Sequence, residues 1–223
     1  MFRRETEYFI HNTILFNLAL FDIDTKLLGG NAEFKPINEK RKFFSKTPEE
    51  KYEFLKQLLG ELQAFYLDLR ATLQDAQYAQ LSQLISAVRS AMHSAKSMND
   101  VGSNITNLRH SSTDIKFNFF THQKKRTEEL YQQLNELMEQ KTKTNFEKLQ
   151  SIFVVIEENY SSSLNNFYKE AQNAPIQNLD ITTALNFNRE LFTSNKAMLM
   201  AVKDFLLGEK EAEDFNDIPV YKT

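Results

Sequence analysis

The 223-residue sequence is most informative in what it lacks. It contains no cysteine, which excludes disulfides, thiolate metal sites and cysteine nucleophiles. It has 5 glycines and 4 prolines, so the chain has few points at which it can turn. A sandwich, barrel or propeller needs a turn roughly every 8–12 residues, and an α/β nucleotide fold needs a GxGxxG or GxxxxGKS/T loop. No such loop occurs in the sequence, so the composition favours few, long helices.

Long apolar runs and a strong excess of one charge are also missing. The most apolar stretch, 9–21, is interrupted by the polar residues 11–13 and by Asn17, and it is shorter than the roughly 20 residues of a membrane-spanning helix. Residues 3–7 mix both charge signs and precede no small-residue cleavage site, unlike a signal peptide. The net charge of −3 gives no reason to expect nucleic-acid binding. We therefore expect a soluble, cytoplasmic, all-α protein.

Phenylalanine is unusually frequent. The chain has 19 Phe and no Trp, and 41% of its residues are hydrophobic, which is enough for a substantial core. Most of the phenylalanines are expected to pack between helices. Phe117, Phe119 and Phe120 lie too close together to share one helical stripe, so part of this cluster is expected to face a partner or a groove between helices.

Apolar residues at three- and four-residue steps predict six long helices. The clearest start is Thr47–Glu50, which combines an N-cap, a proline at the first helical position and a glutamate at the capping-box spacing. Gly29–Gly30 is expected to end the first helix, and Asp75 to cap the third. The six expected helices cover 5–28, 48–69, 76–109, the segment from the 111–114 break to 140, 145–171 and 179–207.

The lengths of these helices predict the architecture. At about 1.5 Å per residue most of them are rods of roughly 40 Å, and such rods pack as up-down bundles. Six helices divide into two sets of three, so we predict one three-helix bundle over residues 1–110 and a second over 111–208. Residues 209–223 hold five acidic and two basic side chains with Pro219, and a flexible acidic tail is expected there.

The third and sixth helices share a short pattern at an offset of one hundred residues. Residues 94–98 (SAKSM) align with 194–198 (SNKAM), and Arg89 aligns with Arg189. Two amphipathic helices can match in this way by chance or through duplication. Because each match lies in the third helix of its set, we favour duplication with pseudo-twofold symmetry.

Familiar catalytic patterns are missing. The Glu-x-x-His pairs of di-iron bundles and the HExxH zinc helix occur around none of the four histidines. The serine-containing runs 111–113 and 161–163 lack a Gly-x-Ser-x-Gly elbow. We nominate no catalytic residue and predict that the chain is not an enzyme.

The third helix resembles a known motif. Residues 95–108, AKSMNDVGSNITNL, resemble the core motif of PhoU-like domains, in the version found at the C-terminus of bacterial sodium/phosphate cotransporters. Residues 185–197 on the sixth helix are similar to the same subgroup, and the resemblance extends from about Tyr52 to Leu207. It implies two three-helix bundles related by a pseudo-twofold axis, in agreement with the helix count.

The resemblance also bears on metal binding. Several PhoU proteins carry metal clusters on a Glu/Asp-x-x-x-Asp motif in each repeat, a spacing that places two carboxylates on one helix face. The aligned positions here are Asn99 and Ser103 in the first repeat, and Leu199 and Lys203 in the second. None of these supplies an anionic ligand, and Lys203 would repel a cation. We therefore predict no metal at these positions and no cofactor.

The function implied by the resemblance is regulatory. We expect a non-enzymatic cytosolic domain of a sodium-dependent phosphate cotransporter that acts in phosphate uptake and homeostasis through protein–protein contacts. Its expected partner is the transmembrane portion of the transporter, linked covalently or in trans at the inner face of the membrane, and a homodimer is a further option.

The candidate interaction surface consists of the basic residues that recur between the two helices: Arg89, Lys96, Arg189 and Lys196. Each of them could equally be a solvated side chain or a member of an intramolecular ion pair. Two alternative functions stay open: a metal-binding helical bundle with ligands from several helices, and a stand-alone helical scaffold unrelated to phosphate.

Overall fold

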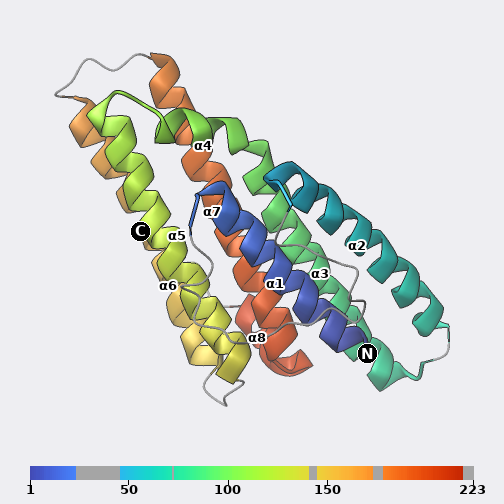
Figure 1. Cartoon of the computed structure of the whole chain (residues 1–223). Coiled ribbons are helices and arrows are strands. Elements are labelled where there is room, and N and C mark those ends of the chain that lie inside the picture. Colours follow the sequence, from blue (N-terminus) through green and yellow to red (C-terminus); the bar gives the residue numbers. More distant parts are fainter. Residues whose placement is uncertain (24–45, 72, 141–144, 173–177, 218–223) are drawn as a thin grey trace.

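The computed structural model of the chain describes residues 1–23, 46–71, 73–140, 145–172 and 178–217. Every regular element within these ranges is a helix (Figure 1), which confirms the all-α class. The described residues form eight helices: α1 Phe2–Leu20, α2 Pro48–Arg70, α3 Asp75–Asp100, α4 Gly102–Arg109, α5 Asp114–Gln140, α6 Asn145–Ala171, α7 Asn178–Leu206 and α8 Glu209–Asn216.

The first helix ends earlier than predicted, at Leu20 rather than at residue 28. Asp22 adopts a left-handed conformation with φ 55°. Its N–H donates to the carbonyl of Ala19, and the N–H of Ile23 donates to that of Leu18, which is the Schellman arrangement that terminates helices. An aspartate occupies the position where glycine is usual. The positions of the glycines in the sequence therefore did not predict this helix end. The expected stop at Gly29–Gly30 lies outside the described residues.

The second helix begins at the predicted capping box. The Thr47 hydroxyl accepts the N–H of Glu50 at 3.3 Å, and the Glu50 carboxylate accepts the N–H of Thr47 at 2.8 Å. Pro48 occupies the first helical position. These two reciprocal bonds satisfy N–H groups that the helix itself leaves without acceptors.

The third predicted helix is divided in two. Val101, with φ −107° and ψ 11°, separates α3 from α4, and Gly102, a poor helix former, follows at once. The prediction that Asp75 caps this helix is wrong: Asp75 is its first residue, and Gln74 precedes it without a side-chain capping bond.

The predicted flexible tail is wrong for residues 209–216, which form α8. The Glu211 carboxylate accepts the N–H of Gly208 at 3.2 Å at the start of this helix. The ring of Phe215 is buried, and its centroid lies 5.6 Å from that of Phe146 and 6.3 Å from that of Phe153. Apolar packing against α6 therefore orders a segment whose acidic composition indicated a tail.

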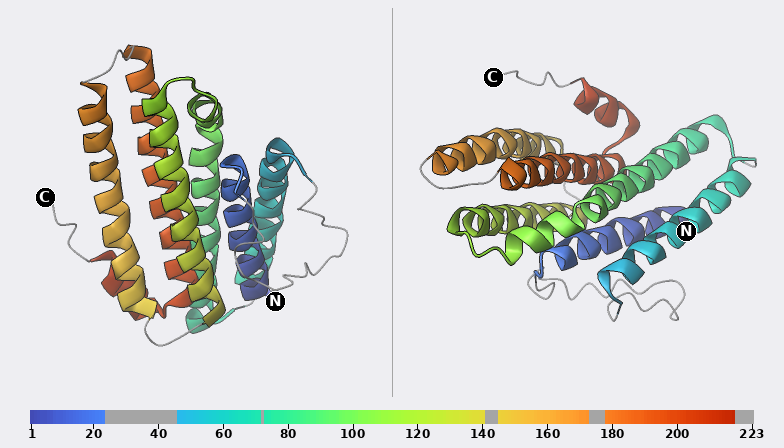
Figure 2. Two further views of the ribbon diagram at one scale, coloured as in Figure 1. Left: turned by 60° about the vertical axis from the view of Figure 1, so that its left-hand side comes forward. Right: turned by 90° about the horizontal axis from the view of Figure 1, so that it is seen from above.

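The long helices pack in two neighbourhoods. Helices α1, α2 and α3 contact one another, α5, α6 and α7 contact one another, and the most extensive contact in the described structure joins α3 to α7. Figure 2 shows α5–α7 on one side of the molecule and α1–α3 on the other. Hydrogen bonds join Gln83 to the carbonyl of Leu207 and Ser86 to Asp204, so α3 and α7 run antiparallel.

Phenylalanines fill much of the core between these helices. Phe119 and Phe120 are buried, while Phe117 is 48% exposed. Phe21 stacks on Phe120 at a centroid distance of 5.9 Å and lies 6.0 Å from Phe187. These aromatic contacts join the end of α1 to α5 and α7, and they account for part of the phenylalanine excess.

Candidate functional site

The positions aligned with the metal motif differ in their surroundings. Asn99 and Ser103 are exposed, whereas Leu199 and Lys203 are buried. Among the residues that the structure describes, no group of three or more His, Asp or Glu side chains lies close enough to share a metal ion.

Lys203 has a structural role that the sequence did not reveal. Its side chain is almost fully buried, and its ammonium nitrogen lies 2.8 Å from a carboxylate oxygen of Asp204. The same nitrogen donates to the side-chain oxygen of Asn216 at 2.7 Å and to the carbonyl of Ala212 at 3.5 Å. Lys203 therefore links α7 to the last turn of α8, where a cation meets the negative end of the helix dipole.

The helices α3 and α7 form a groove that contains two of the four predicted interaction residues. Its volume is about 440 Å³. We call it the α3–α7 groove and define it by its lining residues, which are Arg89, Ser90 and His93 from α3, and Phe192, Thr193, Lys196, Ala197 and Met200 from α7. The antiparallel packing of the two helices brings Arg89 and Lys196 into this groove, although they are more than one hundred residues apart in sequence.

The other two predicted residues lie outside this groove. Lys96 is exposed on α3, one turn beyond His93. Arg189 is exposed on α7, one turn before Thr193, whose hydroxyl donates to the Arg189 carbonyl at 3.0 Å. The structure therefore places the four basic residues along one pair of helices but collects only Arg89 and Lys196 into one groove.

Lys196 is held in place by aromatic rings and one acid. Its ammonium nitrogen lies 5.1 Å from the ring centroid of Phe153 and 5.6 Å from that of Phe192. A carboxylate oxygen of Glu157 lies 3.4 Å away. Cation–π contacts of this kind orient an ammonium group while leaving its charge in place.

Arg89 has no such restraint among the residues that the structure describes. Within the described part of the chain, neither Arg89 nor His93 has an ion pair or a hydrogen-bond partner for its side chain, and the Ser90 hydroxyl has none either. The α3 side of the groove therefore presents a guanidinium, an imidazole and a hydroxyl whose hydrogen-bonding capacity is free. Sequence reasoning missed Ser90 and His93, although the three- and four-residue steps from Arg89 to His93 and Lys96 mark one helix face.

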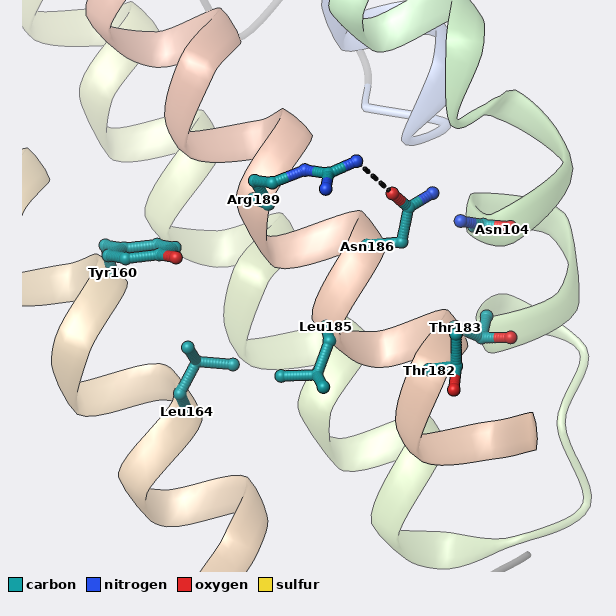
Figure 3. A pocket seen from close by; sticks show the side chains of 8 residues that line it. All are labelled: Asn104, Tyr160, Leu164, Thr182, Thr183, Leu185, Asn186 and Arg189. Carbon is teal, nitrogen blue, oxygen red and sulfur yellow. Dashed lines mark hydrogen bonds between the residues drawn. The ribbon is translucent and has the colours of Figure 1, made fainter. Parts of the chain in front are cut away.

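Arg189 belongs to a second hollow, shown in Figure 3. This α4–α7 hollow has a volume of about 420 Å³ and is lined by Asn104, Tyr160, Leu164, Thr182, Thr183, Leu185, Asn186 and Arg189. The Arg189 guanidinium donates to the Asn186 side-chain oxygen at 2.7 Å and to Glu190 at 3.1 Å. Unlike Arg89, the guanidinium of Arg189 is already engaged by neighbours on its own helix.

A pair of tilted aromatic rings joins the two hollows. Tyr160 lines the α4–α7 hollow and Phe192 lines the α3–α7 groove. Their centroids are 4.6 Å apart with an interplanar angle of 32°. In Figure 3 the Tyr160 ring projects from α6 toward α7. The two concavities are thus neighbours along α7 that share one aromatic contact.

A buried polar cluster lies where the two helix neighbourhoods meet. The hydroxyl oxygens of Ser94 and Ser194 are 2.8 Å apart. The Asn17 amide donates to Ser94 at 2.9 Å and to the Tyr131 hydroxyl at 2.7 Å. Burial raises the pKa of Tyr131, so this phenol stays neutral at physiological pH. The cluster joins α1, α3, α5 and α7 and is shielded from solvent, so its role is structural.

The chain matches no family model, no curated protein and no solved structure. Among the helices of the described ranges, none combines the length and the apolar character needed to cross a bilayer.

Proposed function

We propose that the chain is a non-enzymatic, PhoU-like regulatory domain that acts on a sodium-dependent phosphate cotransporter through contacts of its α3–α7 face. On this proposal it works at the cytosolic side of the membrane, joined to the transmembrane portion of the transporter or bound to it in trans. The observation that carries the proposal is the antiparallel contact of α3 and α7, because the first PhoU-like motif begins on α3 and continues into α4, and the second lies on α7.

The proposed duplication is supported by the contact between Ser94 and Ser194. These residues are one hundred positions apart, the offset of the sequence repeat, and their hydroxyl oxygens are 2.8 Å apart. A residue that touches its own counterpart lies beside a local twofold axis. The contacts of α1, α2 and α3 with one another, and of α5, α6 and α7 with one another, agree with two three-helix bundles that meet along α3 and α7, with residues 1–110 and 111–208 as the proposed units.

The contact surface is proposed to centre on Arg89 and Lys96. Both are exposed, and neither has an ion-pair partner within the described residues. Surface cations without an ion-pair partner produce a positive field that steers an acidic partner surface during association. Arg189 and Lys196, each with a carboxylate within 3.4 Å, are proposed as the secondary part of the same surface.

Transport measurements test this proposal. The membrane portion of the cotransporter from the source cell is reconstituted in proteoliposomes, and sodium-driven phosphate uptake is measured with and without the purified chain on the cytosolic side. We expect the chain to change the uptake rate and an Arg89→Glu, Lys96→Glu double variant to lose this effect. Lys148→Glu, a reversal at an exposed position on α6, is the matched control. An uptake rate indifferent to the chain would refute the proposal.

A further inference from the structure

We propose that the α3–α7 groove binds a small phosphate monoester, with the phosphate between Arg89 and Lys196 and the organic group on the apolar part of the lining. The groove lies on the α3–α7 face that the proposed function uses. The biological role of phosphate ester binding rests on that proposed function, whereas the binding itself is argued from the residues that line the groove.

The charges of the groove favour a doubly charged oxyanion. Arg89 and His93 line the groove from α3, and Lys196 lines it from α7 with its ammonium group held beside Phe192 and, on α6, Phe153 and Glu157. The guanidinium of Arg89 presents a fork of N–H donors that matches two phosphate oxygens, and the ammonium of Lys196 acts as a point charge. Glu157, 3.4 Å from Lys196, is the only acidic group that the described structure places against these cations, so the groove keeps a net positive charge.

Neutral donors complete the site for the anion. The Ser90 hydroxyl has no partner in the described structure and is free to donate. Thr193 donates its proton to the Arg189 carbonyl, so it cannot serve as a donor to the anion. Arg89, Lys196, Ser90 and the N–H of His93 therefore supply donors to a tetrahedral oxyanion from two helices.

The rest of the lining is apolar and favours an organic group beside the phosphate. Phe192, Ala197 and Met200 all belong to α7. Phe192 is fixed by its contacts with Tyr160 and Lys196, so it offers a pre-organised surface. A volume of about 440 Å³ lies within the range of roughly 300–1,000 Å³ of small-molecule sites and exceeds the space that a phosphate alone requires.

Calorimetric titration of the purified chain tests the inference. The probes are phenyl phosphate and inorganic phosphate at constant ionic strength and pH 7.5. We expect phenyl phosphate to bind several-fold more tightly than inorganic phosphate, because its ring removes apolar surface from water. Arg89→Gln and Lys196→Gln should each weaken phenyl phosphate binding about tenfold, the loss typical of one charge-assisted hydrogen bond.

Controls separate this site from general charge effects. Lys148→Gln removes an exposed lysine from α6 and should leave binding unchanged, while Arg89→Lys should retain part of it. Circular dichroism verifies that each variant is folded. The inference is overturned if phenyl phosphate does not bind, if both probes bind equally, or if Lys148→Gln weakens binding as much as Arg89→Gln. None of these outcomes bears on the proteoliposome assay, which needs no added ester.

Discussion

The ammonium nitrogen of Lys203 lies 2.7 Å from the side-chain oxygen of Asn216, and this bond fastens the end of α8 to α7. Lys203 is also paired with Asp204 at 2.8 Å, with both side chains largely shielded from solvent. A buried ion pair of this kind is costly to break on one side only, because the remaining charge is left without compensation.

Lys203→Ala is therefore expected to lower the free energy of unfolding by about 3 kcal/mol and to speed amide hydrogen exchange throughout α8. Urea denaturation and exchange mass spectrometry measure the two effects. Lys203→Met keeps the aliphatic packing without the charge and should cost less than the alanine variant. Equal exchange rates in α8 for the wild-type chain and Lys203→Ala would show that the lysine does not hold this helix.

Asn17→Ala should lower the free energy of unfolding, because Asn17 belongs to the buried polar cluster. The Asn17 amide donates to Ser94 and to the Tyr131 hydroxyl, and all three side chains are buried. Removing a buried partner of this kind costs roughly 1–3 kcal/mol, and the midpoint of urea unfolding should fall accordingly. The matched control is Asn165→Ala at an exposed position on α6, which should be neutral. A similar loss for both variants would contradict the importance of the cluster.

Thr47→Ala removes the hydroxyl that accepts the Glu50 N–H at the start of α2. A lost N-cap costs about 1 kcal/mol, and faster hydrogen exchange is expected in the first turn of α2. Thr47→Ser keeps an acceptor oxygen and serves as the control. If the serine variant loses as much stability as the alanine variant, the methyl group of Thr47 rather than its hydroxyl matters.

Stability should depend on pH through His11. Burial lowers the pKa of His11 from 6.5 to about 4, against a weaker opposing effect of its hydrogen bond with Asn135. Below pH 6.5 the unfolded chain binds a proton at this position that the folded chain does not bind until about pH 4. The contribution of His11 to stability is therefore complete above pH 6.5 and is lost as the pH falls toward 4, with a total on the order of 3 kcal/mol.

A His11→Gln variant isolates this effect from the carboxylates that also titrate in acid. Urea unfolding at pH 7.5 and at pH 4.5 is compared for the two proteins. The wild-type chain should lose more stability between these values than the variant does. Equal losses would mean that His11 does not take part in acid destabilisation.

The sequence predicted the features that depend on neighbouring residues. The start of α2 was readable because Thr47 and Glu50 satisfy each other within one turn. The ends of α5 and α6 were also predicted correctly from the local pattern of apolar residues, at Gln140 and Ala171. The recurrence of Arg89 and Lys196 marked them as candidates, and the structure places both in one groove.

Features that depend on distant contacts were not predictable in this way. At the end of α1, where Asp22 is left-handed, the ring of Phe21 packs against Phe120 of α5 and Phe187 of α7, and a search for glycine overlooks this end. The order of α8 comes from the contact of Phe215 with two rings of α6. Ser90 and His93, which have no side-chain hydrogen-bond partner in the described part of the chain, became candidates only because α7 packs beside them and forms the other wall of the groove.

The contact between Ser94 and Ser194 has a consequence for the origin of the chain. In an isologous dimer, a residue beside the twofold axis contacts its own copy in the other subunit. Under the proposed duplication, the fusion of two such subunits into one polypeptide would preserve this contact as Ser94 against Ser194. Each proposed half would then carry a self-complementary face on its third helix. An ancestral protein of half this length would have been a twofold homodimer, and the covalent link would have allowed its two faces to diverge, which would account for the different surroundings of Arg89 and Arg189.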